Sequence, residues 1–285
     1  MIVISTAALP ALHSWQPSAP SPRRTQRLAE ILDLLTTRGA MSVGALCGEL
    51  QVSPATLRRD MTHLQDQGLV SRTRGGARAN TGPELPVRLR DTKSPLAKHA
   101  IAVTAAALLP TDRPLAVAIG GGSTTAEVAR ELGHRQRLTI VTNALTTAAA
   151  VAARPNLQVI MTGGVIRASS FELVGSLAEN AFNGISVNVA ILGADGVSAA
   201  HGVTTHDHTE ARTNHAMVTH AHRLMVVADG SKVGQTTVAK VADASEIDIL
   251  VTDPSADPDE LARLTGLGVT VHLARISADV SLPLS

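Results

Sequence analysis

The stretch of this 285-residue sequence with the clearest capacity for chemistry is GGGSTT at residues 120–125, directly after an apolar run. Backbone N–H groups in such a turn, hydroxyls from Ser and Thr, and the positive end of a following helix together suit a phosphate group. A glycine-rich turn with a hydroxyl cap also occurs as a purely structural feature. This one has neither the lysine of a P-loop nor the spaced glycines of a dinucleotide fingerprint. Its surroundings must therefore decide whether it marks a ligand site.

Small or polar residues also follow four further apolar runs that we predict as strands, at residues 138–142, 157–161, 187–192 and 224–228. Ligands of parallel α/β sheets bind just beyond the carboxyl ends of the strands. Five such strand ends therefore predict one common site. Its candidate residues are Gly121, Gly122, Ser123, Thr124, Thr125, Asn143, Gly163, Gly164, Asp195 and Lys232.

The elements that must position this site extend over residues 93–275. Apolar runs at 115–119, 247–251 and 269–273 join the four above. A helical segment at 95–109 precedes the first run, and others such as 124–132, 145–153 and 208–222 lie between runs. Most of the runs are continuously apolar, as expected for strands covered on both faces. This alternation predicts an α/β domain with a parallel sheet.

A second chemistry-bearing stretch begins at Ser53, which can cap a helix, with Pro54 at the first helical position. An apolar stripe at helical spacing follows, formed by Leu57, Met61 and Leu64. Arg59 points almost directly away from that stripe at 100° per residue. Alone, the stretch fits an ordinary amphipathic surface helix equally well.

The segments around this helix indicate a winged helix-turn-helix over residues 23–79. A helix ending at Gly39 and a short helix capped by Ser42 precede it, and a basic two-stranded wing follows Gly68. The third helix of such a domain enters the major groove. Asp60 lies nearer the core side, where we expect it to orient an arginine or cap a helix. The candidate DNA-binding residues are Ser53, Thr56, Arg58, Arg59, His63, Arg72, Arg74 and Arg78.

The charge is divided unevenly between the two parts of the chain. Residues 21–80 contain nine Arg, no Lys and five acidic residues, whereas residues 81–285 contain 16 basic and 19 acidic residues. A basic head on a mildly acidic body suggests that the head binds a polyanion. Two Phe, one Trp and no Tyr argue against nucleic-acid binding by aromatic stacking.

The remaining segments set the expected organisation. Residues 1–22 have no charged side chain and several prolines, and we interpret them as a flexible extension or an upstream start. Residues 80–92 are predicted to be a linker and 276–285 a tail. The single Cys47 fits a reducing compartment, and polar residues break every apolar run too early for a membrane span, so we expect a cytoplasmic protein.

The run from Arg27 to Ala77 resembles the DNA-binding head of the DeoR family of bacterial transcriptional regulators. Distinctive motifs are TLRRD at 56–60 and RGGA at 74–77. The body shares GGSTT at 121–125, VTN at 141–143, TGG at 162–164, VG at 174–175, GADG at 193–196, Glu210 followed by AM at 216–217, and ADGSK at 228–232. The resemblance covers nearly all of residues 23–253. The family usually has Leu where Met61 stands, a volume-conserving change.

The resemblance implies a small α+β winged helix-turn-helix, then an α/β domain that resembles ribose-5-phosphate isomerase and senses phosphorylated sugars or related metabolites. Ser123, Thr124 and Thr125 would then hold the phosphate, and the rest of the pocket would be lined by Asn143, Asp195, Glu210 and Lys232. We therefore expect a repressor of carbohydrate metabolism genes with no cofactor or metal. Its expected partners are double-stranded operator DNA with direct or inverted repeats, the effector, and further copies of the chain in a dimer or tetramer.

A sugar-phosphate isomerase with a fused DNA-binding head is the alternative. Asp195, Glu210 and Lys232 could move a proton along a sugar carbon chain. Two departures from the isomerases count against it. Gly196-Val197 stand where they have a second acid, and HGVTT at 201–205 replaces a lysine and a glycine-rich run. We expect a binding pocket without turnover.

Six of the 11 histidines lie between His201 and His222. Such a cluster could suggest a metal site, but its spacing fits no ligand set and cysteine partners are absent. We expect a solvated helix face and loop, which near the pocket could make effector binding depend on pH.

Overall fold

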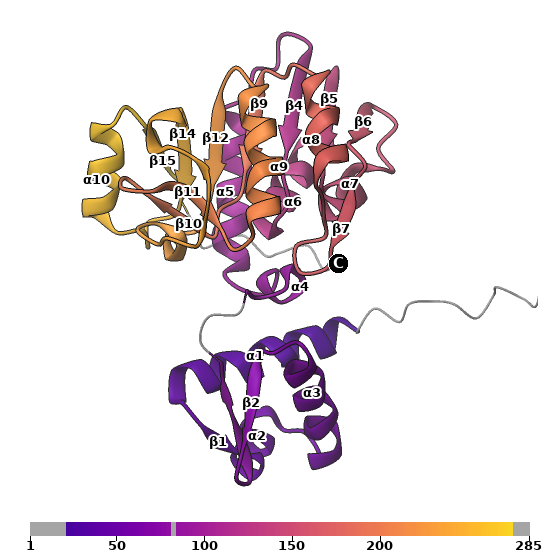
Figure 1. The fold of residues 1–285 in the computed structure, drawn as a ribbon, viewed down its shortest axis with the longest axis vertical. Helices are drawn as coiled ribbons and strands as arrows, with labels where there is room; N and C mark the ends of the chain where they lie inside the picture. Colours follow the sequence, from indigo (N-terminus) through magenta and orange to yellow (C-terminus); the bar gives the residue numbers. More distant parts are fainter. Residues whose placement is uncertain (1–20, 81–83, 276–285) are drawn as a thin grey trace, which may run out of the picture. The chain divides into compact units, whose positions relative to one another are not determined.

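The computed structural model describes residues 21–80 and 84–275, which form two compact units divided between Thr81 and Gly82 (Figure 1). The predicted extension and tail lie outside the described residues, except that Ser21 and Pro22 begin the first helix. No helix among the described residues is long and apolar enough to cross a membrane.

The first unit is the predicted winged helix-turn-helix. Its helices are α1 (Pro22–Arg38), α2 (Val43–Leu50) and α3 (Pro54–Asp66), and its wing is β2 (Val70–Thr73) and β3 (Gly76–Ala79). A two-residue strand that was not predicted, β1 (Met41–Ser42), pairs with β3 and completes the sheet in the order β1-β3-β2. Ser53 caps α3 as predicted, since its Oγ accepts from the backbone N–H of Thr56 at 3.3 Å.

The core of this unit fixes which face of α3 is turned inward. Leu57 and Leu64 are completely buried together with aliphatic residues of α1 and α2. Asp60 is buried beside them and accepts from the Nε of Arg24 at 3.0 Å and of Arg27 at 2.6 Å. The prediction that Asp60 orients an arginine is confirmed, and it orients two. This pairing joins α3 to α1.

The second unit is built on a parallel seven-stranded sheet in the order β15-β14-β12-β9-β4-β5-β6. All seven predicted strands are confirmed. They are β4 (Leu115–Ile119), β5 (Leu138–Thr142), β6 (Leu157–Met161), β9 (Val189–Leu192), β12 (Leu224–Val227), β14 (Ile249–Thr252) and β15 (Thr270–Leu273).

Helices cover both faces of this sheet, which explains its continuously apolar strands. Figure 1 shows α8 (Ser176–Asn183) and α9 (His208–Thr219) in front of it, with α5 (Pro95–Ala107) and α6 (Ser123–Leu132) behind. Successive residues of one strand enter different cores: Ala118 packs in the cluster with α9, whereas Val117 and Ile119 pack in the cluster with α5 and α6. Two further helices are α7 (Leu145–Val151) and α10 (Pro258–Gly266).

Several short elements were not predicted. A small antiparallel sheet contains β10 (Gly196–Ser198), β11 (Gly202–Thr205) and β13 (Ala239–Ala242). A hairpin contains β7 (Val165–Arg167) and β8 (Glu172–Val174). The short 3-10 helices are η2 (Gly230–Lys232) and η3 (Ala244–Glu246). At three or four residues each, these elements are too short for hydrophobic periodicity to reveal them.

The predicted linker differs from the structure over most of its length. Residues 84–92 belong to the second unit, and within them lies the helix α4 (Val87–Arg90). Val87 is 3% and Leu89 4% exposed. These two apolar residues alternate with Arg88 and Arg90. An apolar pattern of this length is too short to predict that the stretch packs against a domain.

Candidate functional site

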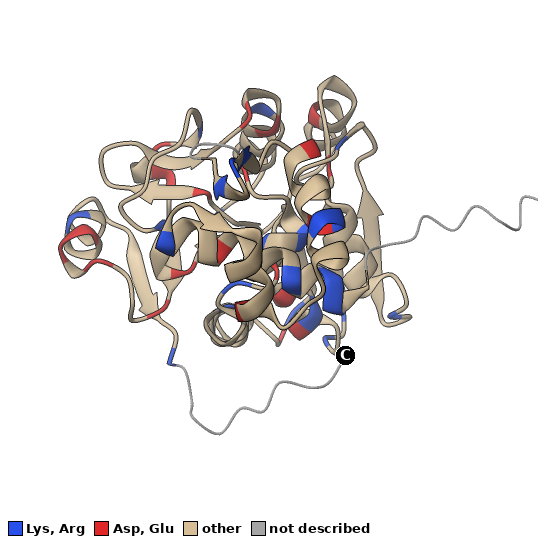
Figure 2. Ribbon diagram, turned by 90° about the horizontal axis from the view of Figure 1, so that it is seen from below, with Lys and Arg blue, Asp and Glu red and all other residues tan. Residues whose placement is uncertain are grey.

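The outer face of α3 presents the predicted DNA-reading side chains. Arg58 and Arg59 are exposed, and no described carboxylate lies within ion-pair distance of either. Thr56 and His63 are half-buried on the same helix. Basic positions are blue in Figure 2. The helix therefore offers two unpaired guanidinium groups and a hydroxyl toward a groove, the groups that read base edges and phosphates.

The wing arginines differ from one another in their contacts. Arg74 and Arg78 are exposed. Arg72 instead donates from Nε to Gln65 at 2.8 Å and from Nη2 to Thr62 at 2.9 Å, both on α3. It therefore ties the wing to the recognition helix, a contact that the sequence did not predict. That Arg72 also contacts DNA stays a prediction, as do the other DNA-binding assignments.

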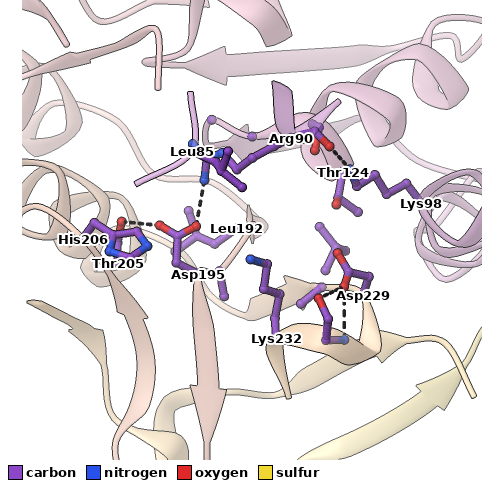
Figure 3. Close-up of a pocket in the computed structure, with 18 of the residues that line it drawn as sticks. Leu85, Arg90, Lys98, Thr124, Leu192, Asp195, Thr205, His206, Asp229 and Lys232 are labelled. Carbon is purple, nitrogen blue, oxygen red and sulfur yellow. Dashed lines mark hydrogen bonds and ion pairs between the residues drawn. The ribbon is translucent and has the colours of Figure 1, made fainter. Parts of the chain in front are cut away.

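A cavity of about 400 Å³ lies at the carboxyl ends of the central strands of the second unit (Figure 3). This is within the usual size range of small-molecule sites. Seven predicted effector residues line it: Gly121, Gly122, Ser123, Thr124, Asp195, Glu210 and Lys232. They come from the ends of β4, β9 and β12 and from the start of α9. The structure therefore brings together residues up to 111 positions apart in the sequence.

The glycine-rich turn opens α6 at one side of this cavity. Gly122 is the N-cap with φ 125°, a conformation that favours glycine. Gly121 leaves room for a neighbour, since a Cβ there would stand 2.2 Å from Oε1 of Glu172. Ser123 and Thr124 stand in the first turn of α6, whose free backbone N–H groups and dipole favour an anion.

Four predicted residues do not line the cavity. Thr125 is fully buried and donates to the carbonyl oxygen of Gly122 at 3.0 Å, closing the helix start. Asn143 is also fully buried and donates from Nδ2 to Glu172 at 3.1 Å, so it lies behind the wall. Gly163 and Gly164 form the turn between β6 and β7 with φ 73° and 129°. Glycine occurs at these two positions because the backbone conformation favours it. Sequence spacing alone does not distinguish this cause from contact with a ligand.

Three cationic residues of the cavity were not predicted from the sequence, because they come before the first strand and the prediction considered only residues that follow strands or match the family motifs. Arg90, Lys93 and Lys98 line it from α4, the following turn and α5. Lys98 is 4% exposed and donates from Nζ to the carbonyl oxygen of Arg90. Burial lowers the pKa of Lys98 to about 8, against the opposing charge of Asp229. The sequence signal that could have identified Lys98 is the presence of a lysine inside an alanine-rich apolar helix.

The opposite side of the cavity is acidic, and Figure 3 shows Asp195, Thr205 and His206 there, away from Thr124 and Lys98. The Oγ1 of Thr205 is 2.5 Å from Oε1 of Glu210 and 3.1 Å from Oδ2 of Asp195. Burial raises the pKa of Glu210. Other lining residues that the sequence did not predict include Glu172, Asn214, Asp229 and Ser231.

Glu172 forms part of the cavity wall behind the glycine-rich turn. Burial, and then the neighbouring charge of Glu210, raise the pKa of Glu172 well above its ordinary value. Its Oε2 accepts from Nδ2 of both Asn143 and Asn214 at 3.1 Å. The cavity thus combines anion-binding groups at the start of α6 with carboxyl groups, both behind that turn and across the cavity, that can bind hydroxyls. That pattern suits a phosphorylated polyol or sugar.

The histidines divide between the cavity and a separate surface. His206 lines the cavity. His215 and His220 instead lie within hydrogen-bond distance of the carbonyl oxygens of Val241 and Ala216, at 2.9 and 2.8 Å. No group of three metal-ligating side chains occurs in the part of the chain that the structure describes.

A winged helix-turn-helix joined to an α/β unit with a polar small-molecule cavity defines a DNA-binding transcriptional regulator. Comparison with known families matches the DeoR-like helix-turn-helix domain over residues 27–82 and the DeoR C terminal sensor domain over residues 93–254. The chain belongs to the DeoR family of transcriptional regulators.

Curated relatives match over nearly their whole length. The HTH-type transcriptional regulator GlpR of Haloferax volcanii is 33% identical over 86% of this chain and 96% of its own. The glycerol-3-phosphate regulon repressor of Escherichia coli K12 is 29% identical over 88% of this chain and 99% of its own. A ribose 5-phosphate isomerase A structure from Methanocaldococcus jannaschii matches 50% of this chain and 53% of that chain at 18% identity and a TM-score of 0.35.

Proposed function

We propose that this protein represses genes of sugar or carbohydrate metabolism and that a phosphorylated sugar or related metabolite controls its operator binding. The observation that carries the proposal is the glycine-rich start of α6, which shares a cavity with the buried Lys98 and with carboxyl groups. A helix N-terminus with a nearby cation binds a phosphate, and carboxylates accept from sugar hydroxyls. The name of the glycerol-3-phosphate regulon repressor supports a phosphorylated effector.

In this proposal Ser123 and Thr124, with Lys98, bind the phosphate, while Asp195 and Glu210 bind hydroxyls. Lys232 completes the cationic side. The charge of a bound dianion offsets the cations that line the cavity. No cofactor or metal takes part.

The DNA-binding unit reads the operator through α3, with Arg59 and Thr56 contacting bases and Arg58, Arg74 and Arg78 contacting the backbone. One head covers few base pairs, so we infer a homo-oligomer, a dimer or tetramer, that places heads on direct or inverted half-sites.

We further propose that the cavity binds without turnover. Proton transfer needs a base that is free to approach substrate. Asp195 is instead ion-paired with Arg90 at 2.7 Å, and Glu210 with Arg167 at 3.0 Å. Gly196-Val197 form part of the buried strand β10 where the isomerases have a second acid. Conversion of ribose 5-phosphate to ribulose 5-phosphate by the purified chain would contradict this proposal.

Operator binding is tested with Arg59→Ala. Selection from random DNA duplexes with the full chain should enrich a repeated half-site. Arg59→Ala should bind that site about fivefold more weakly or worse, since one bidentate base contact contributes about 1–3 kcal/mol. The matched control is Arg38→Ala, which removes the same charge from α1, where Arg38 pairs with Glu49. Equal affinity of Arg59→Ala and wild type would refute the assignment.

Effector binding is tested by thermal shift with glycerol 3-phosphate, ribose 5-phosphate, fructose 6-phosphate and glucosamine 6-phosphate. A compound that binds the folded chain raises its melting temperature by mass action. Operator affinity is then measured with and without each compound that does so. If no compound in the panel shifts the melting temperature or changes operator affinity, the proposed effector class is wrong.

A further inference from the structure

The first described residues of the second unit form part of the effector cavity. Residues 84–93, here called the strap, follow the DNA-binding unit in the sequence after residues 81–83 and contain α4. Leu85, Arg90 and Lys93 of the strap line the cavity. The strap is held on the second unit by the buried Val87, whose backbone N–H donates to the carbonyl oxygen of Ser169 at 2.8 Å. A ligand in the cavity therefore touches the segment that leads to the DNA-binding unit.

Ion pairs attach the strap to two acidic groups of the cavity, to Asp195 directly and to Glu210 through Arg167. Arg90 of the strap donates to Oδ1 of Asp195 at 2.7 Å and to Glu84 at 3.3 Å. Glu84 of the strap also accepts from Arg167, which in turn donates to Oε2 of Glu210 at 3.0 Å. All five side chains are 17% exposed or less, so solvent screens these pairs weakly. The strap is thus tied to the residues that face the ligand.

One hydroxyl closes this network into a ring. Thr205 lies within hydrogen-bond distance of both Asp195 and Glu210, but its single proton can be donated to one of them. One of the two carboxylates therefore lacks this hydrogen bond. Arg90 also has an unsatisfied donor, because its Nε is buried and has no acceptor among the described residues. A buried donor without an acceptor is costly. An oxygen atom of a ligand in the cavity would supply one.

We propose that the bound effector competes with the Arg90–Asp195 ion pair that ties the strap to the cavity, and that the resulting change in the strap alters operator affinity. This inference rests on the proposed function. A ligand shifts a conformational equilibrium only through contacts that differ between the two states. An effector oxygen on Arg90 and an effector hydroxyl on Asp195 are such contacts, because each replaces part of the Arg90–Asp195 pair. By linkage, operator DNA changes effector affinity by the same factor.

The test uses Glu84→Gln, which weakens two ion pairs of the strap with an isosteric side chain. Glu84 is not one of the residues that line the cavity, so effector contacts are kept. With the panel compound that most raises the wild-type melting temperature, we expect Glu84→Gln to keep that shift. The ratio of operator Kd with and without the compound should fall toward one, by about fivefold or more if the coupling is of the usual size.

The matched control is Glu179→Gln, which removes an ion pair with Arg212 at 2.8 Å on α8 and α9. It should keep the wild-type ratio. A wild-type ratio in Glu84→Gln, with the compound still bound, would overturn the strap proposal. If no panel compound acts on the wild type, the proposed function fails and the strap proposal fails with it.

A measurement on the unmodified chain keeps the proposal testable if Glu84→Gln does not fold. Hydrogen exchange of the peptide covering residues 84–93 should change when the same compound is added, because the Val87 to Ser169 bond holds this segment. The peptide of α10 at 258–266 is the internal control. Unchanged exchange of the strap at saturating compound would contradict the proposal.

Discussion

We expect the affinity for a phosphorylated effector to fall as pH rises through about 8, because Lys98 loses its proton there. Burial lowers the pKa of Lys98 to about 8, while the charges of Asp229 and Asp91 partly oppose that change. The sign follows from the charge of the ligand. A phosphate monoester is a dianion above pH 7, since its second pKa is about 6. It therefore prefers the protonated ammonium that exists below pH 8.

The size of the effect follows from the same pKa. At pH 9 a group with a pKa of about 8 is protonated in roughly one molecule in ten. If only the protonated form binds the effector well, Kd rises about tenfold between pH 7 and pH 9, equivalent to about 1.4 kcal/mol. The slope should begin near pH 8 and approach one decade per pH unit.

Isothermal titration calorimetry from pH 7 to pH 9.5, with the strongest panel compound, measures this dependence. Lys98→Gln should bind more weakly at pH 7 and show no decade-per-unit slope above pH 8. Comparison of the two chains removes contributions from other titrating groups of the cavity. A flat wild-type profile, or an equally steep one in Lys98→Gln, would refute the role of Lys98.

Two further variants test the glycine-rich turn and the recognition helix. Ser123→Ala with Thr124→Ala should lower effector affinity by about tenfold or more, as two hydrogen bonds to a charged group are lost, while operator binding without effector is kept; an unchanged effector titration would place the phosphate elsewhere. Asp60→Asn should destabilise the DNA-binding unit by about 1–3 kcal/mol, because Arg24 and Arg27 lose a buried negative charge and one of them its acceptor, and the melting temperature of that unit should fall. Glu49→Gln, which disrupts the exposed pair with Arg38, should change stability by less than about 1 kcal/mol, and an equal loss in both variants would contradict this reasoning.

The layered fold could be predicted from the sequence because its periodic signals are long and locally consistent. Strands such as 115–119 and 224–227 are continuously apolar, and the structure buries them under helices on both faces. The three helices of the first unit carried capping residues that the structure uses, including Ser42 and Ser53. The hairpin of β7 and β8 and the sheet of β10, β11 and β13 were not predicted. Strands of three or four residues are too short to show a hydrophobic periodicity.

The cavity was predicted in outline, and its errors have two physical causes. Residues at strand ends were located well because a parallel sheet gathers those ends at one edge. Sequence position could not say whether a side chain there points into the cavity or behind it, as with Asn143. Nor could it locate groups brought in by tertiary packing, such as Arg90 and Lys98, whose positions depend on where α4 and α5 dock.

The arginine contacts of the DNA-binding unit also limit how strongly salt can act on operator binding. Of its nine arginines, Arg24 and Arg27 are held by Asp60, Arg38 by Glu49, and Arg72 by α3. Five have no acceptor among the described residues, namely Arg23, Arg58, Arg59, Arg74 and Arg78. Each phosphate that a cation neutralises releases about 0.9 counterion. Because Arg59 is proposed to contact a base, at most four of the five are left for phosphates, and a head should release at most about four counterions, less than half of what its nine arginines suggest. Operator binding should therefore weaken less steeply with salt than the composition suggests.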